Sequence, residues 1–269
     1  MITYIISGIV AWSFIRYAKK KGFLLRLFIS KKKKQALHEF FARSFSYYNL
    51  LSPTEQNKFV LRVNTFRQLK QLEISPEIRN SSTDVELLIC AALTQITFGY
   101  FDFELDAFAR IIIRPGSFYS KLVNNEVKGL TLGNGIVYYS WEDFLKGYIF
   151  ENDKVNLALH ELAHALYIDR FHGVEDENWE MWKYYAEIEV TRLKTAASPF
   201  FRSYGKTSVD EFWAVCVECF FEDPLTFRRD YSQLYFATAR LLKQDMAGRL
   251  TQTSIVAVTP ATNSSSTAD

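Results

Sequence analysis

The sequence predicts an α+β fold in which one small sheet lies beside several helices. Helix-like segments come first along the chain, two short strand-like runs follow, and further helix-like segments come last. About 200 residues take part in this pattern, which is roughly enough to bury one large core. We therefore expect one main domain.

The elements follow from hydrophobic spacing and turn residues. Apolar residues recur with helical spacing in Tyr47–Leu72 and Val85–Phe98. Strands are expected at Ala109–Arg114 and Gly135–Trp141, which are joined through the Gly- and Asn-containing segment Asn124–Gly135. Four helices are expected after them, at Asp153–Phe171, Asn178–Ala196, Asp210–Phe221 and Pro224–Leu242.

The first of these later helices carries the sequence His160-Glu161-Leu162-Ala163-His164. Residues four apart lie on one helix face, so His160 and His164 can offer two imidazole nitrogens to one ion. Glu161 stands beside that ion, where its carboxylate can accept a proton from a zinc-activated water. The pattern predicts a zinc site with Glu161 as general base.

The helix around this motif is apolar nearly all round, which is typical of a buried helix. Asn152 and Asp153 supply N-cap chemistry, and Gly173 can end the helix. Two buried histidines one turn apart need polar partners. Backbone carbonyls are the alternative partner, but a metal is favoured because the chain has only four histidines.

Zinc needs a third protein ligand. His38 lies in a basic N-terminal stretch and His172 at the helix end, so neither is a good candidate. The predicted helix that Ser208 or Asp210 caps, and that Pro224 ends, carries two carboxylates seven residues apart. They are Glu211 and Glu218, and spacing alone leaves both open as the third ligand.

The three cysteines, Cys90, Cys216 and Cys219, are too few for a disulfide scaffold, as expected in a reducing compartment. The Cys-x-x-Cys pair lies inside a predicted helix without a following βαβ pattern, so it is a weak metal or redox motif. We expect both of its thiols to face the core.

Residues 1–34 differ from the rest of the chain. They hold nine of the 32 Lys and Arg residues and no acid, so the remainder carries a net charge of −7. An acidic remainder without a basic face argues against nucleic-acid binding. Ile2–Ile15 is a nearly continuous apolar run with positive charge directly after it, which favours a membrane anchor with the main domain in the cytoplasm.

This anchor is short, because a span needs about 20 apolar residues. A helix packed on the main domain is therefore the alternative for residues 2–18, and a cleaved signal peptide is disfavoured. At the other end, Thr251–Asp269 is rich in Ser, Thr and Ala and is expected to be a disordered tail. The expected division is an anchor segment at 1–34, a domain at 35–250 and a tail at 251–269.

Most of the chain, from about residue 47 to 246, resembles the MtfA family (Mlc titration factor A). These are gluzincin-like zinc peptidases akin in structure to the catalytic domain of anthrax lethal factor. The resemblance is carried by Leu50–Glu55, Arg114–Phe118, Gly129–Gly147, His160–His164, Asp210–Val215 and Glu218–Pro224.

The resemblance implies a zincin-like fold with a zinc ion (Zn2+) held by His160, His164 and Glu211. It also implies Glu161 as general base and Tyr204, seven residues before Glu211, as a donor to the oxyanion. Glu218 would then orient a histidine.

For function, the resemblance implies aminopeptidase-type hydrolysis of small peptide substrates and a regulatory protein partner. The stretch Ala165–Asp176 departs from the Gly-rich, proline-ended loop of many members, so substrate preference does not transfer. We expect a peptide to add as an extra strand beside an edge strand at Ile136–Tyr139. The alternative is a membrane-tethered, non-catalytic zincin-fold module that binds a regulatory protein.

Overall fold

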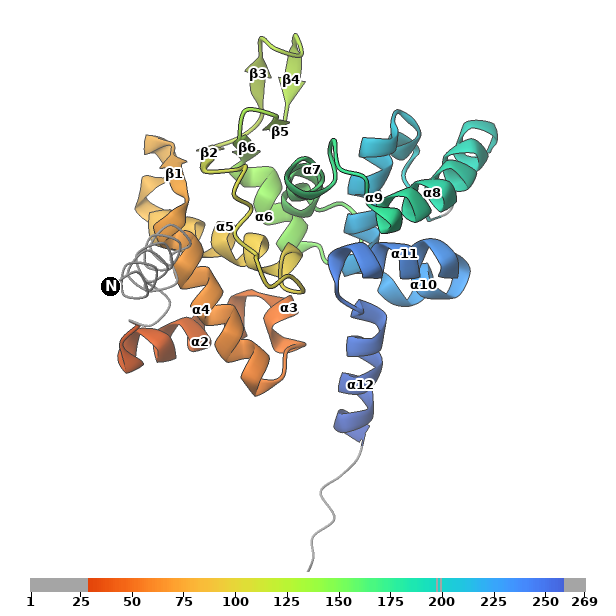
Figure 1. Ribbon diagram of the computed structural model, residues 1–269. Helices are drawn as coiled ribbons and strands as arrows, with labels where there is room; N and C mark the ends of the chain where they lie inside the picture. Colours follow the sequence, from red (N-terminus) through yellow and green to blue (C-terminus); the bar gives the residue numbers. More distant parts are fainter. Residues whose placement is uncertain (1–28, 197, 199, 259–269) are drawn as a thin grey trace, which may run out of the picture.

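A computed structural model describes residues 29–196, 198 and 200–258. In this part of the chain, helices pack against a four-stranded sheet, and a separate two-stranded hairpin stands clear of them (Figure 1), which confirms the α+β class. The strands are β1 (Gln71–Ile74), β2 (Arg110–Arg114), β3 (Phe118–Ser120), β4 (Asn125–Val127), β5 (Gly129–Leu132) and β6 (Ile136–Ser140).

The described helices fall before β2 and after β6, as the sequence pattern predicts, but β1 lies between α4 and η2 and was not predicted. The earlier ones are α2 (Lys31–Ser44), α3 (Ser46–Asn49), α4 (Pro53–Leu69), the 3-10 helix η2 (Pro76–Ser81) and α5 (Ser82–Ile96). The later ones are α6 (Trp141–Ile149), α7 (Leu157–Arg170), α8 (Glu177–Thr195), the 3-10 helix η3 (Ser203–Lys206), α9 (Val209–Glu222), α10 (Pro224–Asp230), α11 (Ser232–Leu242) and α12 (Met246–Val258).

The four-stranded sheet has the order β1-β2-β6-β5. Strands β1, β2 and β6 are parallel, and β5 runs antiparallel to β6 at the edge. The prediction that Ile136–Tyr139 forms the edge is therefore wrong, because these residues lie in β6, between β2 and β5. The physical reason is that the expected connecting segment itself pairs, with Leu130 opposite Tyr138.

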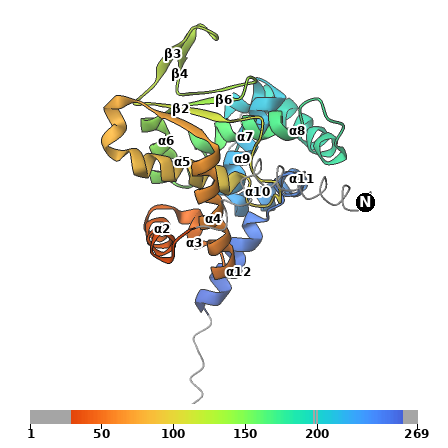
Figure 2. The same cartoon turned by 60° about the vertical axis from the view of Figure 1, so that its left-hand side comes forward.

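Strands β3 and β4 pair with each other and form a hairpin that projects beyond the sheet (Figures 1 and 2). Large apolar side chains near its tip are exposed, with Leu122 73% and Val123 48% accessible. The hairpin and the edge strand β5 follow one another directly in the chain. Strand β5 is also the sheet edge that packs against α7.

Helix α7 packs between the sheet edge and α9 (Figure 1). The indole of Trp213 in α9 is fully buried, and its Nε1 donates to the carbonyl oxygen of Ala163 in α7 over 2.9 Å. The thiols of Cys216 and Cys219 are buried on α9, as predicted. This packing fixes how the two helices face each other.

The helix ends differ in detail from the prediction. Asn156 caps α7, whereas Asn152 and Asp153 lie in the preceding turn, so the N-cap assignment to them is wrong. Asn152 has φ +76°, a left-handed conformation that asparagine tolerates better than most residues. The helix expected at Pro224–Leu242 is divided into α10 and α11 at Tyr231.

The two chain ends are only partly described. Helix α12 continues to Val258, so the first eight residues of the expected tail Thr251–Asp269 are helical rather than disordered. Residues 259–269 and the apolar run at residues 2–18 lie outside the described residues. Within the part of the chain that the structure describes, none of the helices combines the length and apolar character needed to cross a membrane.

Candidate metal centre

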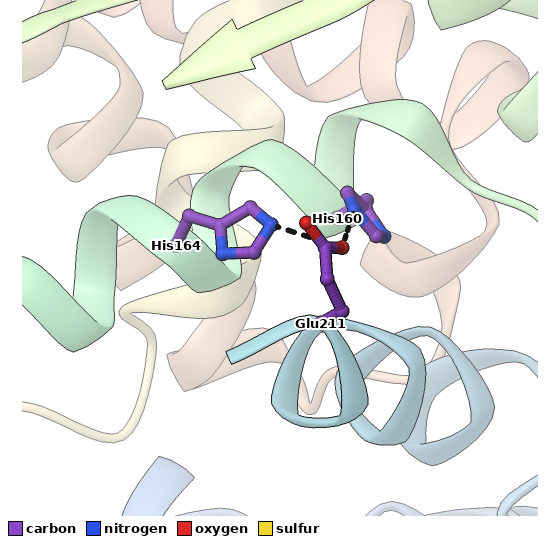
Figure 3. Close-up of side chains that lie close together, drawn as sticks. All are labelled: His160, His164 and Glu211. Atoms are coloured by element: carbon purple, nitrogen blue, oxygen red, sulfur yellow. Dashed lines mark hydrogen bonds and ion pairs between the residues drawn. The ribbon is translucent and has the colours of Figure 1, made fainter. Parts of the chain in front are cut away.

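Helices α7 and α9 bring the side chains of His160, His164 and Glu211 together (Figure 3). The Oε2 atom of Glu211 lies 3.1 Å from Nε2 of His160 and 3.5 Å from Nε2 of His164. One ligand atom from each residue lies within 4.8 Å of the others. Among the described residues, these three form the group of metal-ligating side chains that could hold an ion.

Two helix caps set the positions of these side chains. The Oδ1 atom of Asn156 accepts from the backbone nitrogen of Leu159 over 3.2 Å, next to the first histidine. Its amide Nδ2 donates to the carbonyl oxygen of Gly147 over 2.7 Å, which joins α6 to the start of α7. In α9, the hydroxyl of Ser208 accepts from the backbone nitrogen of Glu211 over 3.1 Å.

Glu218 lies on the far side of the His160 ring from Glu211. Its Oε2 atom is 3.2 Å from Nδ1 of His160, and its Oε1 atom accepts from the backbone nitrogen of Asn156 over 2.8 Å. Arg202 also donates to this carboxylate, which is 99% buried. A carboxylate here keeps a hydrogen on Nδ1 and leaves Nε2 facing the cluster.

The pKa values of the cluster follow from its shared charge. Burial lowers the pKa of His160, but its hydrogen bonds with Glu211 and Glu218 raise it to about 10 overall. Burial raises the pKa of Glu211, and its hydrogen bonds with His160 and His164 bring that pKa well below its usual range. The arrangement therefore favours positive charge between these side chains.

The three residues fit a catalytic zinc site. Two imidazole nitrogens and one carboxylate oxygen are a known ligand set that leaves a further position open. With bonds of about 2.0–2.1 Å in tetrahedral geometry, neighbouring ligand atoms stand roughly 3.3 Å apart. The observed separations of 3.1 and 3.5 Å bracket this value.

Glu161 is 94% buried and lies beside the cluster rather than in it. Burial raises the pKa of its carboxyl group, opposed by the charges of His160 and His164. The hydroxyl of Thr131 in β5 donates to Oε2 of Glu161 over 2.8 Å. The carboxylate thus stands between the sheet edge and the cluster.

Tyr204 belongs to η3 and remains 49% exposed. Its ring centroid lies 5.9 Å from that of His160, and it lines the same cavity as the cluster. Burial, and then the negative charge of Glu211, raise the pKa of its phenol. The phenol therefore carries its proton at neutral pH and can donate a hydrogen bond.

The cluster opens into a cavity of about 720 Å³. Its walls come from the β3–β4 hairpin, from β5, from the end of α7, and from His172 in the turn after α7, which stands apart from the metal cluster. A second cavity of about 590 Å³ adjoins it and shares His160, Glu161 and Tyr204. The cleft therefore extends on both sides of the cluster.

Comparison with family models gives one match, to the glucose-regulated metallo-peptidase M90 family, over residues 18–243. The chain belongs to this family. It is therefore a metallopeptidase, a hydrolase that acts on peptide bonds, and the MtfA resemblance is confirmed. A comparison with curated proteins gives no significant match.

The M90 match spans all of the residues in the cluster and its surroundings. Several residues that surround the cluster lack a sequence signal of their own. Thr131, Asn156 and Arg202 contact Glu161, the start of α7 and Glu218, yet they come from three separate loops or strands. The buried carboxylate of Glu218 could indicate Asn156 and Arg202, because it required hydrogen-bond donors, but no such signal pointed to Thr131.

Proposed function

We propose that this M90 metallopeptidase uses zinc, held by His160, His164 and Glu211. The observation that carries the proposal is the separation of the three ligand atoms, at 3.1 and 3.5 Å for the two pairs that share Glu211. The hydrogen bond between His160 and the buried carboxylate of Glu218 further supports it, because outer carboxylates commonly orient zinc-bound histidines.

A zinc ion supplies Lewis acidity, which polarises the scissile carbonyl and lowers the pKa of a bound water. Glu161 accepts the proton of the attacking water as the carbon–oxygen bond forms. It then passes the proton to the nitrogen of the leaving amine as the carbon–nitrogen bond breaks. Tyr204 donates a hydrogen bond to the oxyanion, which its exposed phenol in the cavity supports.

We propose that the peptide substrate pairs with β5. This strand is the outer member of the four-stranded sheet, and Gly129, Leu130 and Thr131 line the cavity. An extended peptide can then add as a further strand. Aminopeptidase-type action is the finer proposal, and it rests on the MtfA resemblance.

The test is Glu161→Gln with a panel of short peptides whose N-termini are either unblocked or acetylated. We expect the variant to keep its metal and to cleave at least about a hundredfold more slowly, since it lacks the general base. Cleavage of the unblocked peptides alone supports aminopeptidase-type action, and equal cleavage of both sets contradicts it.

Two results would contradict the catalytic proposal. One is a Glu161→Gln variant that keeps its metal and cleaves as fast as the parent. The other is a parent protein that binds zinc, cleaves no peptide and captures a protein partner, which would favour the non-catalytic module. An exposed substitution distant from the cleft, Glu187→Gln, serves as the matched control.

We also propose that residues 1–34 attach the domain at 35–250 to the cytoplasmic face of a membrane, and that a regulatory protein binds this domain. The apolar run, with positive charge after it, supports the attachment. The partner rests on the MtfA resemblance alone.

A further inference from the structure

Strand β5 holds the carboxylate of Glu161 by a contact that the metal motif does not contain. The hydroxyl of Thr131 donates to Oε2 of Glu161 over 2.8 Å and also lies 2.9 Å from the backbone carbonyl oxygen of Glu161. A single threonine therefore reaches both the side chain and the helix backbone of the same residue. The His-Glu-x-x-His motif alone does not fix which rotamer the Glu161 side chain adopts.

Gly129 makes room for the same carboxylate. A Cβ atom at residue 129 would lie 2.5 Å from Oε1 and 2.7 Å from Cγ of Glu161. Both distances are far inside van der Waals contact, so any side chain here would push the carboxylate away. Glycine is needed at residue 129 because the carboxylate approaches the backbone closely. Its backbone conformation is not the reason, since Gly129 does not have a positive φ.

The strand geometry puts the two residues on one face. Side chains alternate along a strand, so residues 129 and 131 point to the same side, toward α7. Antiparallel pairing with β6 fixes their register, with Gly129 opposite Tyr139 and Thr131 opposite Val137. Gly129 and Thr131 together form the part of β5 against which the Glu161 side chain packs.

We propose that Thr131 and Gly129 are positioning residues for the general base. Thr131 holds Oε2, and Gly129 admits Oε1, which is left to accept the proton of the attacking water. The inference rests on the proposed function for the role of Glu161 as base. It also means that a peptide paired with β5 is aligned with the base by the strand that it binds.

The kinetic test compares Thr131→Val, which keeps the shape and removes the hydroxyl, with Thr131→Ser, which keeps the hydroxyl. We expect Thr131→Val to lower kcat about 10–100-fold, the usual range for residues that orient a catalytic group, with KM within about twofold and full metal content. Thr131→Ser should recover most of the kcat.

The matched control is Thr65→Val. Thr65 is buried in α4, outside the two cavities beside the cluster, and its hydroxyl donates to the carbonyl oxygen of Leu61 over 2.9 Å. The Thr65→Val substitution removes the same group from a fully buried site, whereas Thr131 is half-buried. A similar fall of kcat in Thr65→Val and Thr131→Val would overturn the proposal, because general loosening would then explain both.

A structural readout separates this proposal from the proposed function. Crystal structures of the parent, Thr131→Val, Thr131→Ser and Gly129→Ala should show the Glu161 carboxylate displaced in the valine and alanine variants and retained in the serine variant. This result holds even if the parent cleaves no peptide, in which case only the proposed function fails. An unmoved carboxylate with unchanged kcat in Thr131→Val would overturn the positioning role, and so would loss of metal from that variant.

Discussion

His160 has a carboxylate on each of its two ring nitrogens. Glu211 is near Nε2 and Glu218 is near Nδ1, so the two candidates that sequence spacing could not separate lie on opposite sides of one imidazole. Their separation of seven residues puts both on one stripe of α9, which is why the pattern predicts two carboxylates facing α7 without ranking them. In the structure, the relative placement of α7 and α9 distinguishes them.

At the residue scale, this difference predicts unequal effects on metal content. Glu211→Ala should lose bound zinc after dialysis against a mild chelator, because one of three protein ligands is gone. Glu218→Gln should retain zinc with affinity lowered about 10–100-fold, since it still accepts from His160 but lacks the charge. Elemental analysis of dialysed protein measures both, and full stoichiometry in Glu211→Ala would shift the assignment to Glu218.

At the scale of elements, long helices and the two five-residue strands were predictable, and the strands of three or four residues were not. Helix α8 begins and ends within one residue of its prediction, because apolar residues recur along 19 positions. Strands β3 and β4 have three residues each, too few for an alternating pattern to stand out. The edge was therefore misassigned to Ile136–Tyr139, although β2 and β6 themselves were predicted.

At the end of α9, the buried carboxyl group of Glu222 is expected to make the stability of the fold depend on pH. Glu222 is 91% buried, and burial raises its pKa to about 7, partly opposed by the side chain of Asn156 and the backbone of Lys154. The folded state then holds this proton at pH values where the unfolded chain, with a pKa near 4.5, has released it. The contribution of Glu222 to the free energy of unfolding therefore falls as pH rises from about 4.5 through 7.

Glu222→Gln removes the ionisation. We expect the variant to be more stable than the parent by about 1–3 kcal/mol at pH 8 and nearly equal to it at pH 4.5. Urea unfolding at the two pH values measures this difference. The exposed Glu187→Gln should show no such dependence, and an equal effect of Glu222→Gln at both pH values would contradict the explanation.

At the scale of the molecule, α4 and α12, which are far apart in the sequence, are joined by an ion pair. Arg249 in α12 donates to both carboxylate oxygens of Glu55, over 3.0 and 2.7 Å, and Glu55 also closes the capping box of α4 with Ser52. These contacts hold α12 against the first half of the fold. They fix the first half of α12, and the helix continues past Thr251, where composition alone predicts a tail.

The proposed attachment of the whole molecule to a membrane can be tested by deleting its N-terminal residues. Deleting residues 2–28 leaves α2 and its cap Ser30 intact, and it should move the protein from the membrane fraction to the soluble fraction, since the apolar run is removed. Cell fractionation with immunoblotting measures the change. Deleting residues 259–269 is the control, and an unchanged distribution of both variants would argue against an N-terminal anchor.

The buried cysteines have a practical consequence. Burial raises the pKa of the thiols of Cys90, Cys216 and Cys219, so all three should react slowly with maleimides. A thiol introduced by Leu122→Cys, at the exposed tip of the β3–β4 hairpin, would then be labelled selectively. With paramagnetic cobalt in place of zinc, such a label would report how far the hairpin stands from the ion while a substrate enters and leaves.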